Sequence, residues 1–440
     1  MKTLVFLTLF VACAFAHTTL FRQSPDDSSS SSSEEVIFTQ KAAVPSSESS
    51  SSEEVIFTKK ALPIAKNRGR KHEKHIQTRS FWQTLKDATS AITEFFFRSN
   101  YHRPDDDTRW EKYKIQYKLK FDDPADEEKA KARFVKNRAK VLKHRDTNPN
   151  SSIDIDLNKF AIMSSKEFRR RKMGLTPETR PEVRSFFSSD MLREKVPDYY
   201  DSRRTPGAVT YIREQGECQG CWAFATVATL ETVFFMKYKK TYKLSEQQLL
   251  DCDGYNEGCD GGTMDAAFNY IKRNGGINPQ KLYPFEEEAK DCRASPLYNR
   301  PIFITDVKGF PKPARAGKPG VQANKIEEMM KVATFQHGAV AIGIDAEHMQ
   351  FYSGGIYTGP CTIGINHGVA IVGYGKCPDT GLDYWIIKNS WGTNWGERGY
   401  LRLARGNNTC GVAQMPSVPI IADNIDLTNV KTDEQVDDEN

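Results

Sequence analysis

Residues 215–224 read Gln215-Gly216-Glu217-Cys218-Gln219-Gly220-Cys221-Trp222-Ala223-Phe224, and they lead into an apolar run that ends at Met236. The length and apolar spacing of this run predict a buried helix with Cys221 at its N-terminus. A helix dipole and a nearby imidazolium both stabilise the thiolate, which is the reactive form of cysteine. The stretch therefore predicts a nucleophilic thiol, although an isolated cysteine in a secreted domain is more often inert or disulfide-bonded.

A base for this thiol is available far downstream. His367 opens the Gly-punctuated apolar run 366–375, which predicts a strand that would hold the imidazole at the end of a stiff sheet element. His337 and His348 flank a shorter apolar run and are expected at the surface. His367 is therefore the candidate general base.

An imidazole base needs a third group that fixes its tautomer and orientation. Asn389 follows the next apolar strand and is the candidate, with Trp391 expected to shield their hydrogen bond from water. Gln215 lies across a Gly-containing turn from Cys221, so its side-chain amide and the Cys221 backbone N–H could converge on one oxygen. Such an arrangement would form an oxyanion hole.

Composition indicates a chain made for the secretory pathway. Residues 1–16 contain an early Lys2, an apolar run and a small-residue end, the pattern of a cleaved signal peptide. Retention as a membrane anchor is the weaker alternative, and no other run approaches the about 20 apolar residues that a span needs. A net charge of +5 over 440 residues is too weak to imply a nucleic-acid partner. The sequons at Asn150 and Asn407 predict glycosylation in such a compartment.

The chain changes character several times along its length. Residues 17–104 form a Ser-rich and then basic extension, expected to be disordered apart from a helical candidate at 81–97. From Trp110 to about Phe168, apolar residues at three- and four-residue steps predict an amphipathic pair of helices. A Pro- and Ser-containing linker leads into a region rich in Gly, aromatics and cysteine, and residues 423–440 form an acidic tail expected to be disordered.

Five blocks resemble the papain-like cysteine peptidases and occur in the family's order: 215–224, 244–252, 256–262, 366–375 and 388–396. The resemblance implies an α+β, papain-like two-lobe fold for residues 194–422. A mostly helical lobe would carry Cys221, a β-barrel-like lobe would carry His367 and Asn389, and the cleft would lie between them. It also implies an unpaired Cys377 and the disulfides Cys218–Cys259, Cys252–Cys292 and Cys361–Cys410.

Residues 105–193 resemble the inhibitory propeptide of the cathepsin L-like branch. Phe134, Asn137 and Val141 keep the spacing of its long helix motif, and residues 157–160 match a second motif, with Ile162 where an acidic residue is usual. The resemblance implies a zymogen whose propeptide runs backwards through the cleft and is cleaved between residues 185 and 196.

The resemblance also implies an apolar S2 subsite that favours Leu or Phe at P2. By position, the substrate-binding residues would be Gly261, Gly262, Met264, Gly343, Ile365, Met415 and, beside the triad, Trp391. Gln219 replaces the family's usual glycine next to the nucleophile and could narrow or polarise the S1 rim. The chain lacks the His-containing occluding loop of dipeptidases, which favours an endopeptidase.

The sequence thus predicts a secreted or lysosomal cysteine endopeptidase that needs no metal or organic cofactor. Its expected partners are protein and peptide substrates, its own propeptide and cystatin-type inhibitors. The alternative is a catalytically weak homologue that acts as a binding or matrix protein through the Ser-rich extension. A redox role for the Cys218-x-x-Cys221 pair is less favoured, because the resemblance implies that Cys218 forms a disulfide with Cys259.

Overall fold

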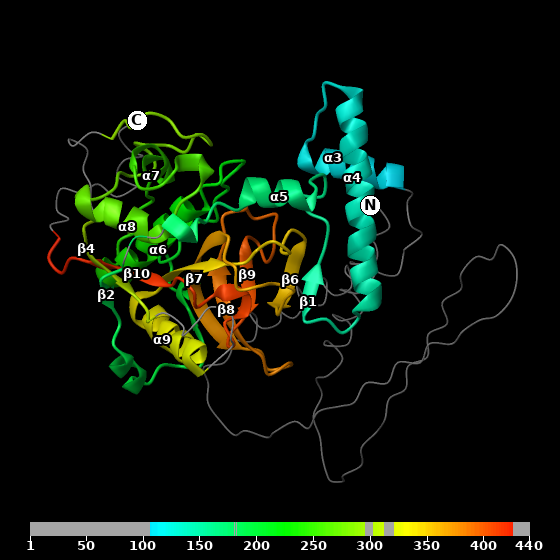
Figure 1. Cartoon of the computed structure of the whole chain (residues 1–440). Coiled ribbons are helices and arrows are strands. Elements are labelled where there is room, and N and C mark those ends of the chain that lie inside the picture. The colour runs from blue at the N-terminus through cyan, green and yellow to red at the C-terminus, as the bar shows by residue number, and fades with distance from the viewer. Residues whose placement is uncertain (1–105, 180, 182, 295–301, 312–320, 426–440) are drawn as a thin grey trace, which may run out of the picture. The chain divides into compact units, whose positions relative to one another are not determined.

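The computed structural model describes residues 106–425 except 180, 182, 295–301 and 312–320 (Figure 1). All of these residues belong to one compact unit, Glu94–Asn440. The predictions for residues 1–16, for the extension 17–104 with its helical candidate, and for the acidic tail beyond Ile425 lie outside the described residues.

Two helices open the described chain, as the apolar periodicity predicts: α3 (Asp106–Tyr117) and α4 (Pro124–Thr147). Asp123 caps α4 by accepting a 2.8 Å hydrogen bond from the Ala125 N–H, and Pro124 occupies the first turn, where its missing N–H costs nothing. One face of α4 is buried against α3 and the loop after residue 157, and its buried residues are Ala130, Phe134, Asn137 and Val141.

The prediction of helix as far as Phe168 is wrong between residues 148 and 164. Helix α4 stops at Thr147 because the next residue, Asn148, precedes a proline, and that position disfavours helical backbone. Strand β1 (Ile153–Ile155) and turns follow, and the Asn137 side chain fixes this loop by donating 2.8 Å hydrogen bonds to the carbonyls of Ala161 and Met163. Helix α5 (Ser165–Lys172) then begins at the cap Ser164.

Helix α6 (Cys221–Tyr238) is the central helix of the rest of the chain. It is buried from Cys221 to Phe235, and it packs against strand β7 (His367–Lys376) and helices α7 (Glu246–Cys252) and α8 (Met264–Arg273). The buried part of the helix contains Thr226, Thr229 and Thr232. Each hydroxyl donates a hydrogen bond to the backbone carbonyl four residues earlier, at 2.7–2.9 Å, so none is left without a partner. Helix α9 (Val321–His337) packs against β5 and β7.

The strands form one mixed, mostly antiparallel sheet in the order β1-β6-β9-β8-β7-β5-β10-β4-β2, with β3 paired to β7. The strands from the region after residue 193 are β3 (Tyr200–Asp201), β4 (Ile304–Gly309), β5 (Val340–Ile344), β6 (Tyr352–Tyr357), β7 (His367–Lys376), β8 (Asp383–Lys388), β9 (Tyr400–Ala404) and β10 (Ser417–Ile421). The segment before residue 194 adds β1 at one end and β2 (Ser185–Phe186) at the other. This segment is therefore built into the sheet at both ends.

The three disulfide bonds lie in the region after residue 210. Disulfides join Cys218 to Cys259, Cys252 to Cys292 and Cys361 to Cys410, which are the pairs that the family resemblance implied, and Cys221 and Cys377 are unpaired. Within the described ranges, no helix combines the length and apolar character needed to cross a membrane.

Candidate active site

The fold places Cys221 at the start of α6, directly after the cap residue Gly220. Its Sγ accepts a 3.4 Å hydrogen bond from the Gly368 N–H on β7, so helix and sheet meet at the thiol. The side chain is fully buried, at 0% exposure, and this burial raises the pKa of the thiol to about 11 against the opposing effect of the Gly368 and Gly174 backbone N–H groups. Loss of solvent thus opposes the thiolate, whereas these backbone N–H groups favour it.

His367 and Asn389 are brought together by the pairing of two adjacent strands. His367 is the first residue of β7, Asn389 directly follows β8, and their Nε2 and Oδ1 atoms lie 2.8 Å apart. The Trp391 ring covers the imidazole, with ring centroids 4.5 Å apart. Burial lowers the pKa of His367 to about 4, against the Asn389 side-chain oxygen and the nearby Lys172 carbonyl, both of which accept hydrogen bonds and so favour the protonated ring.

Gln215 is fixed from both ends of its side-chain amide. Its Oε1 accepts a 2.8 Å hydrogen bond from Ser390 Oγ, and its backbone N–H donates to the Ser390 carbonyl at 2.9 Å. The Nε2 group donates to the Cys218 carbonyl at 3.0 Å and, at 3.4 Å, to the carbonyl of Lys172. A backbone carbonyl of the segment before residue 194 thus lies at the amide that the sequence predicts for the oxyanion hole.

Residues 172–176 pass directly over this site. Leu175 forms a parallel bridge with Gly262: the Gly262 N–H donates to the Gly174 carbonyl at 2.9 Å, and the Thr176 N–H donates to the Gly262 carbonyl at 3.1 Å. The α-carbon of Gly174 packs so closely on the backbone carbonyl of Gln219 that a Cβ there would overlap it. Only glycine fits at this position, beside the nucleophile.

The Leu175 side chain contacts some of the residues predicted to bind substrate. Leu175 is 6% exposed, and its Cδ2 lies against Gly343 together with the side chain of Ile365, while its backbone bridges to Gly262. Gly261 lies beside Thr176 and the Gly174 carbonyl, whereas Met264 lies farther in, against Gly368, and Met415 is buried in the same hydrophobic core.

Trp391 is also covered by the segment before residue 194. The rings of Phe160 and Phe168 pack edge-on against it, with centroid distances of 6.0 and 5.1 Å. Every residue singled out from the sequence for catalysis is consequently shielded in this structure, either by the core or by residues 160–176.

A cluster of buried charged residues that the sequence did not predict lies next to Asn389. Arg213 forms ion pairs with Glu231, at 2.6 Å, and with Glu246, and Lys388 donates at 2.8 Å to Thr210, whose hydroxyl in turn donates to Glu231. Burial lowers the pKa of Lys388 to about 8. These residues lie far apart in the sequence and carry no spacing signal, so only the fold reveals that they support the strand end at Asn389.

The surface placement predicted for two other histidines holds for one of them. His348 is exposed, but His337 is half-buried at the end of α9, where its ring lies 5.7 Å from that of Phe187. The segment before residue 194 covers it, which the local sequence does not indicate. Burial lowers the pKa of His337 to about 4. Among the described residues, no group of three or more His, Cys, Asp or Glu side chains is arranged to hold a metal ion.

Comparison with known proteins agrees with this geometry. Residues 196–420 match the papain family of cysteine proteases, and residues 110–168 match the cathepsin propeptide inhibitor domain. Cysteine endopeptidase RepA of Oryza sativa subsp. japonica is 40% identical over 301 residues, which cover 65% of this chain and 76% of the relative. Cathepsin L of Sarcophaga peregrina is 37% identical over 327 residues, which cover 71% and 92% of the two chains.

Solved proenzymes share the fold. Digestive procathepsin L 3 of the Tenebrio molitor larval midgut aligns with a TM-score of 0.62 and 32% identity, covering 72% of this chain and 100% of that one. The recombinant stem bromelain precursor aligns with a TM-score of 0.63 and 30% identity, covering 72% and 99%.

The chain therefore belongs to the papain family of cysteine proteases. It is a cathepsin L-like cysteine endopeptidase that carries an inhibitory propeptide domain, so its partners include protein substrates and its own propeptide. Its disulfides are typical of oxidising compartments and, with these relatives, identify a protein of the secretory pathway.

Proposed function

We propose that Cys221, His367, Asn389 and Gln215 form the catalytic machinery of this endopeptidase. In the activated enzyme, Cys221 transfers its proton to His367, and the thiolate attacks the carbonyl carbon of the scissile bond. Gln215 Nε2 and the Cys221 backbone N–H stabilise the oxyanion, and His367 then protonates the leaving amine. Water hydrolyses the thioester and restores the thiol. The observation that carries this proposal is the 2.8 Å contact between His367 and Asn389, beside a thiol that accepts from Gly368.

Residues 105–193 act as the propeptide in this proposal, and residues 194–422 act as the catalytic domain. The propeptide inhibits in two ways. Its backbone occupies the catalytic positions, with the Lys172 carbonyl at Gln215 and Gly174 against Gln219. It also excludes water, so that both the thiol and the imidazole favour their neutral forms instead of the reactive ion pair. The parallel bridge of Leu175 with Gly262 supports a propeptide that runs in the direction opposite to a substrate.

Substrate selection at P2 is apolar in this proposal. Leu175 lies where a P2 side chain would bind, against Gly343 and Ile365 and beside Gly262. Removal of the propeptide would open this apolar surface to a leucine or phenylalanine of the substrate. Cystatin-type inhibitors are the proteins we expect to bind the open site, and the activated enzyme is secreted or lysosomal.

An active-site label tests the catalytic assignment. A thiol-directed epoxide should modify Cys221 after propeptide removal, and Cys221→Ser should abolish both labelling and peptide cleavage. Cys377→Ser is the matched control, because that thiol is unpaired but lies on the β7–β8 connection and should be dispensable. An intact activated protein that is neither labelled nor active would contradict the proposal and favour the binding-protein alternative.

A further inference from the structure

Lys172 of the propeptide is a buried cation next to the catalytic site. It is 3% exposed, its ammonium donates to the Gly216 carbonyl, and its Nζ lies 3.8 Å from Glu214 Oε1 and 5.3 Å from the centre of the Phe160 ring. A buried ammonium is costly unless compensating charges and acceptors surround it. Burial lowers the pKa of Lys172 to about 8, and the nearby Glu217 and Glu287 carboxylates oppose that shift, so its surroundings offset part of the cost of burying a basic side chain.

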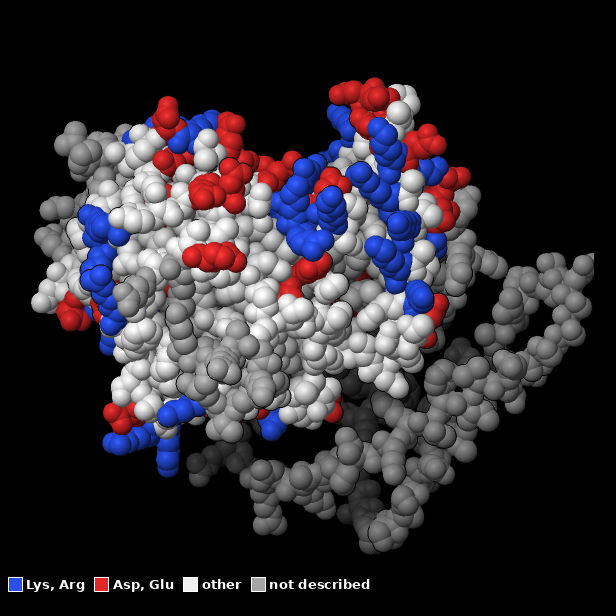
Figure 2. Space-filling model, in the orientation of Figure 1, with Lys and Arg blue, Asp and Glu red and all other residues white. Residues whose placement is uncertain are grey.

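Three carboxylates of the catalytic domain supply that compensation. Glu214 and Glu217 flank the Gln215–Gly216 turn, and the Glu287 carboxylate lies directly against Gly216. We name Glu214, Glu217 and Glu287, together with the Gly216 carbonyl, the acidic subsite. Figure 2 shows basic side chains over α5 bordering a group of acidic side chains on the neighbouring face.

The ion pairs that these carboxylates make in the described chain all go to the propeptide. Glu214 pairs with Lys159 and lies near Lys172, and Glu217 pairs with Arg171. Glu214 Oε1 is itself buried and has no hydrogen-bond partner, although it is directed at Lys172 from 3.8 Å. Departure of the propeptide removes all three cations and leaves the carboxylates without these partners.

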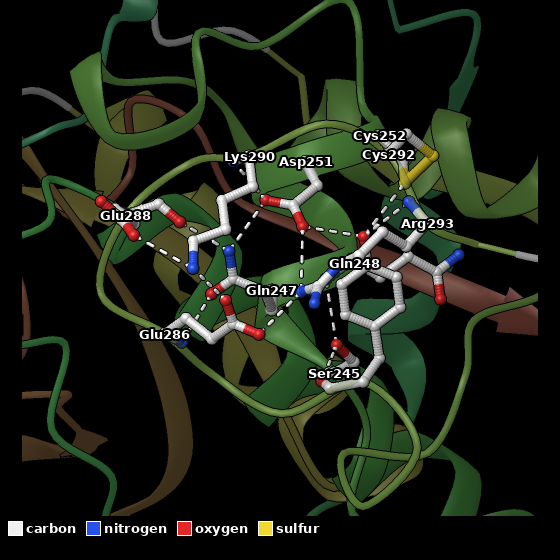
Figure 3. A network of polar contacts seen from close by, with 11 residues as sticks. Ser245, Gln247, Gln248, Asp251, Cys252, Glu286, Glu288, Lys290, Cys292 and Arg293 are labelled. Carbon is white, nitrogen blue, oxygen red and sulfur yellow. Dashed lines mark hydrogen bonds and ion pairs between the residues drawn. A yellow bond between two sulfur atoms is a disulfide. The ribbon is translucent and has the colours of Figure 1, made fainter.

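The loop that carries Glu287 does not depend on the propeptide for its position. Figure 3 shows its neighbours Glu286 and Glu288 joined to helix α7: the Glu286 N–H donates to Gln247 Oε1 at 2.8 Å, and Gln247 Nε2 donates to the Glu288 carbonyl at 2.6 Å. The Lys290 N–H donates to Asp251 at 2.8 Å, and the disulfide Cys252–Cys292 closes the loop. The position of Glu287 is therefore set by contacts within the catalytic domain.

The path of the propeptide locates the acidic subsite relative to the scissile bond. Leu175 occupies the apolar surface proposed for P2, Gly174 lies against Gln219 beside the thiol, and the Lys172 carbonyl reaches Gln215. Since P2 lies on the acyl side of Cys221, Lys172 and the Glu214–Glu217 turn lie toward the leaving group.

We propose that the acidic subsite binds a lysine or arginine side chain of the substrate, one or two residues beyond the scissile bond on the leaving-group side. The inference rests on the proposed catalytic function, and it adds a second specificity determinant to the apolar P2 preference. A basic side chain would replace Lys172, donating to the Gly216 carbonyl and neutralising Glu214 and Glu287.

Matched peptides test this proposal on the activated enzyme. Internally quenched peptides with leucine at P2 would carry Lys, Gln or Glu at P1′ or at P2′, and a fluorogenic dipeptide amide without any leaving-side residue would report catalysis alone. We expect kcat/KM at one of the two positions to be about fivefold or more higher for Lys than for Gln, and lowest for Glu. The Lys-to-Gln ratio should fall as salt is raised, because the carboxylates are partly solvated.

Variants connect the preference to these residues. Glu287→Gln should bring the Lys-to-Gln ratio toward one, and Glu288→Gln, one residue along the same loop and paired instead with Lys290 at 3.0 Å, should leave it unchanged. A ratio within about twofold of one in the unsubstituted enzyme at both positions, with normal cleavage of the dipeptide amide, would overturn the acidic subsite alone. Loss of dipeptide-amide cleavage as well would mean that the proposed function itself has failed.

Discussion

The backbone carbonyl of Lys172 accepts a 3.4 Å hydrogen bond from the side-chain amide of Gln215. A carbonyl of the propeptide thus lies where the scissile carbonyl of a substrate would be polarised. The same amide is held by Ser390 Oγ, so its direction is set by the catalytic domain and not by the propeptide. The proposed oxyanion donor is therefore pre-positioned before activation, as electrostatic stabilisation of a transition state requires.

Removing this donor should impair the chemical step. In Gln215→Ala, kcat of the activated enzyme should fall by about 10²–10³, the usual effect of losing one oxyanion-hole donor. Epoxide labelling of Cys221 should persist, because the thiol and imidazole are untouched. Steady-state kinetics on a P2-leucine substrate would measure the loss, and a decrease smaller than about threefold would exclude Gln215 from the oxyanion hole.

A larger residue at position 174 should weaken inhibition by the propeptide and make Cys221 more accessible in the zymogen. A Cβ in Gly174→Ala would overlap the Gln219 carbonyl, and overpacking of this kind typically costs about 1–3 kcal/mol. That cost falls on the covered state alone, so labelling of Cys221 in the uncleaved zymogen should be about five- to a hundredfold faster.

Gly254→Ala is the matched control for this test, because open space surrounds a Cβ at that position. It should leave the labelling rate at the unsubstituted value. Equal rates for the two variants would show that residue 174 does not hold the propeptide against the nucleophile.

The pH at which Cys221 ionises should differ between zymogen and activated enzyme. Burial raises the pKa of the covered thiol to about 11, so the zymogen should gain thiolate only as the pH rises through that value. After propeptide removal, solvent and a protonated His367 favour thiolate, and the transition should move below the ordinary value of about 8.5. The ultraviolet absorbance of thiolate, taken as the difference between the protein and Cys221→Ser, measures both transitions.

The subtraction also removes the contribution of Cys377, the other free thiol. A zymogen transition at or below the ordinary thiol pKa would contradict inhibition through desolvation. It would leave blockage by the propeptide backbone as the sole mechanism.

Breaking the buried charge cluster should destabilise the whole fold. Arg213→Ala would leave Glu231 and Glu246 buried without their cation, and removal of one partner from a buried pair typically costs about 3–5 kcal/mol. Urea denaturation of the zymogen carrying Cys221→Ser, which prevents autolysis, would measure the change. Lys129→Ala, which removes an exposed ion pair with Asp126, should change the free energy of unfolding by less than about 1 kcal/mol.

Much of the candidate site could be predicted because each element carries its own local signal. Cys221 stands before a long apolar helix, and His367 and Asn389 stand at the ends of strong apolar strands. The pairing of those two strands, which joins His367 to Asn389, was shown by the fold. The helix pair α3–α4 could also be predicted from the spacing of its apolar residues. The C-terminal end of α4 could not, because the apolar spacing continues past Pro149, whereas the helix stops before it.

The sequence by itself therefore determined the family, the helix and strands that carry the proposed catalytic residues, and the presence of an inhibitory segment. Only the tertiary structure decided the burial of Cys221 and His367 and the surroundings of Lys172. Desolvation depends on every atom packed around a group, so the raised pKa of the Cys221 thiol could not be deduced from its place at the start of α6. The acidic subsite is likewise a property of the fold, because Glu214, Glu217 and Glu287 come from two separate loops and lie together only around Lys172.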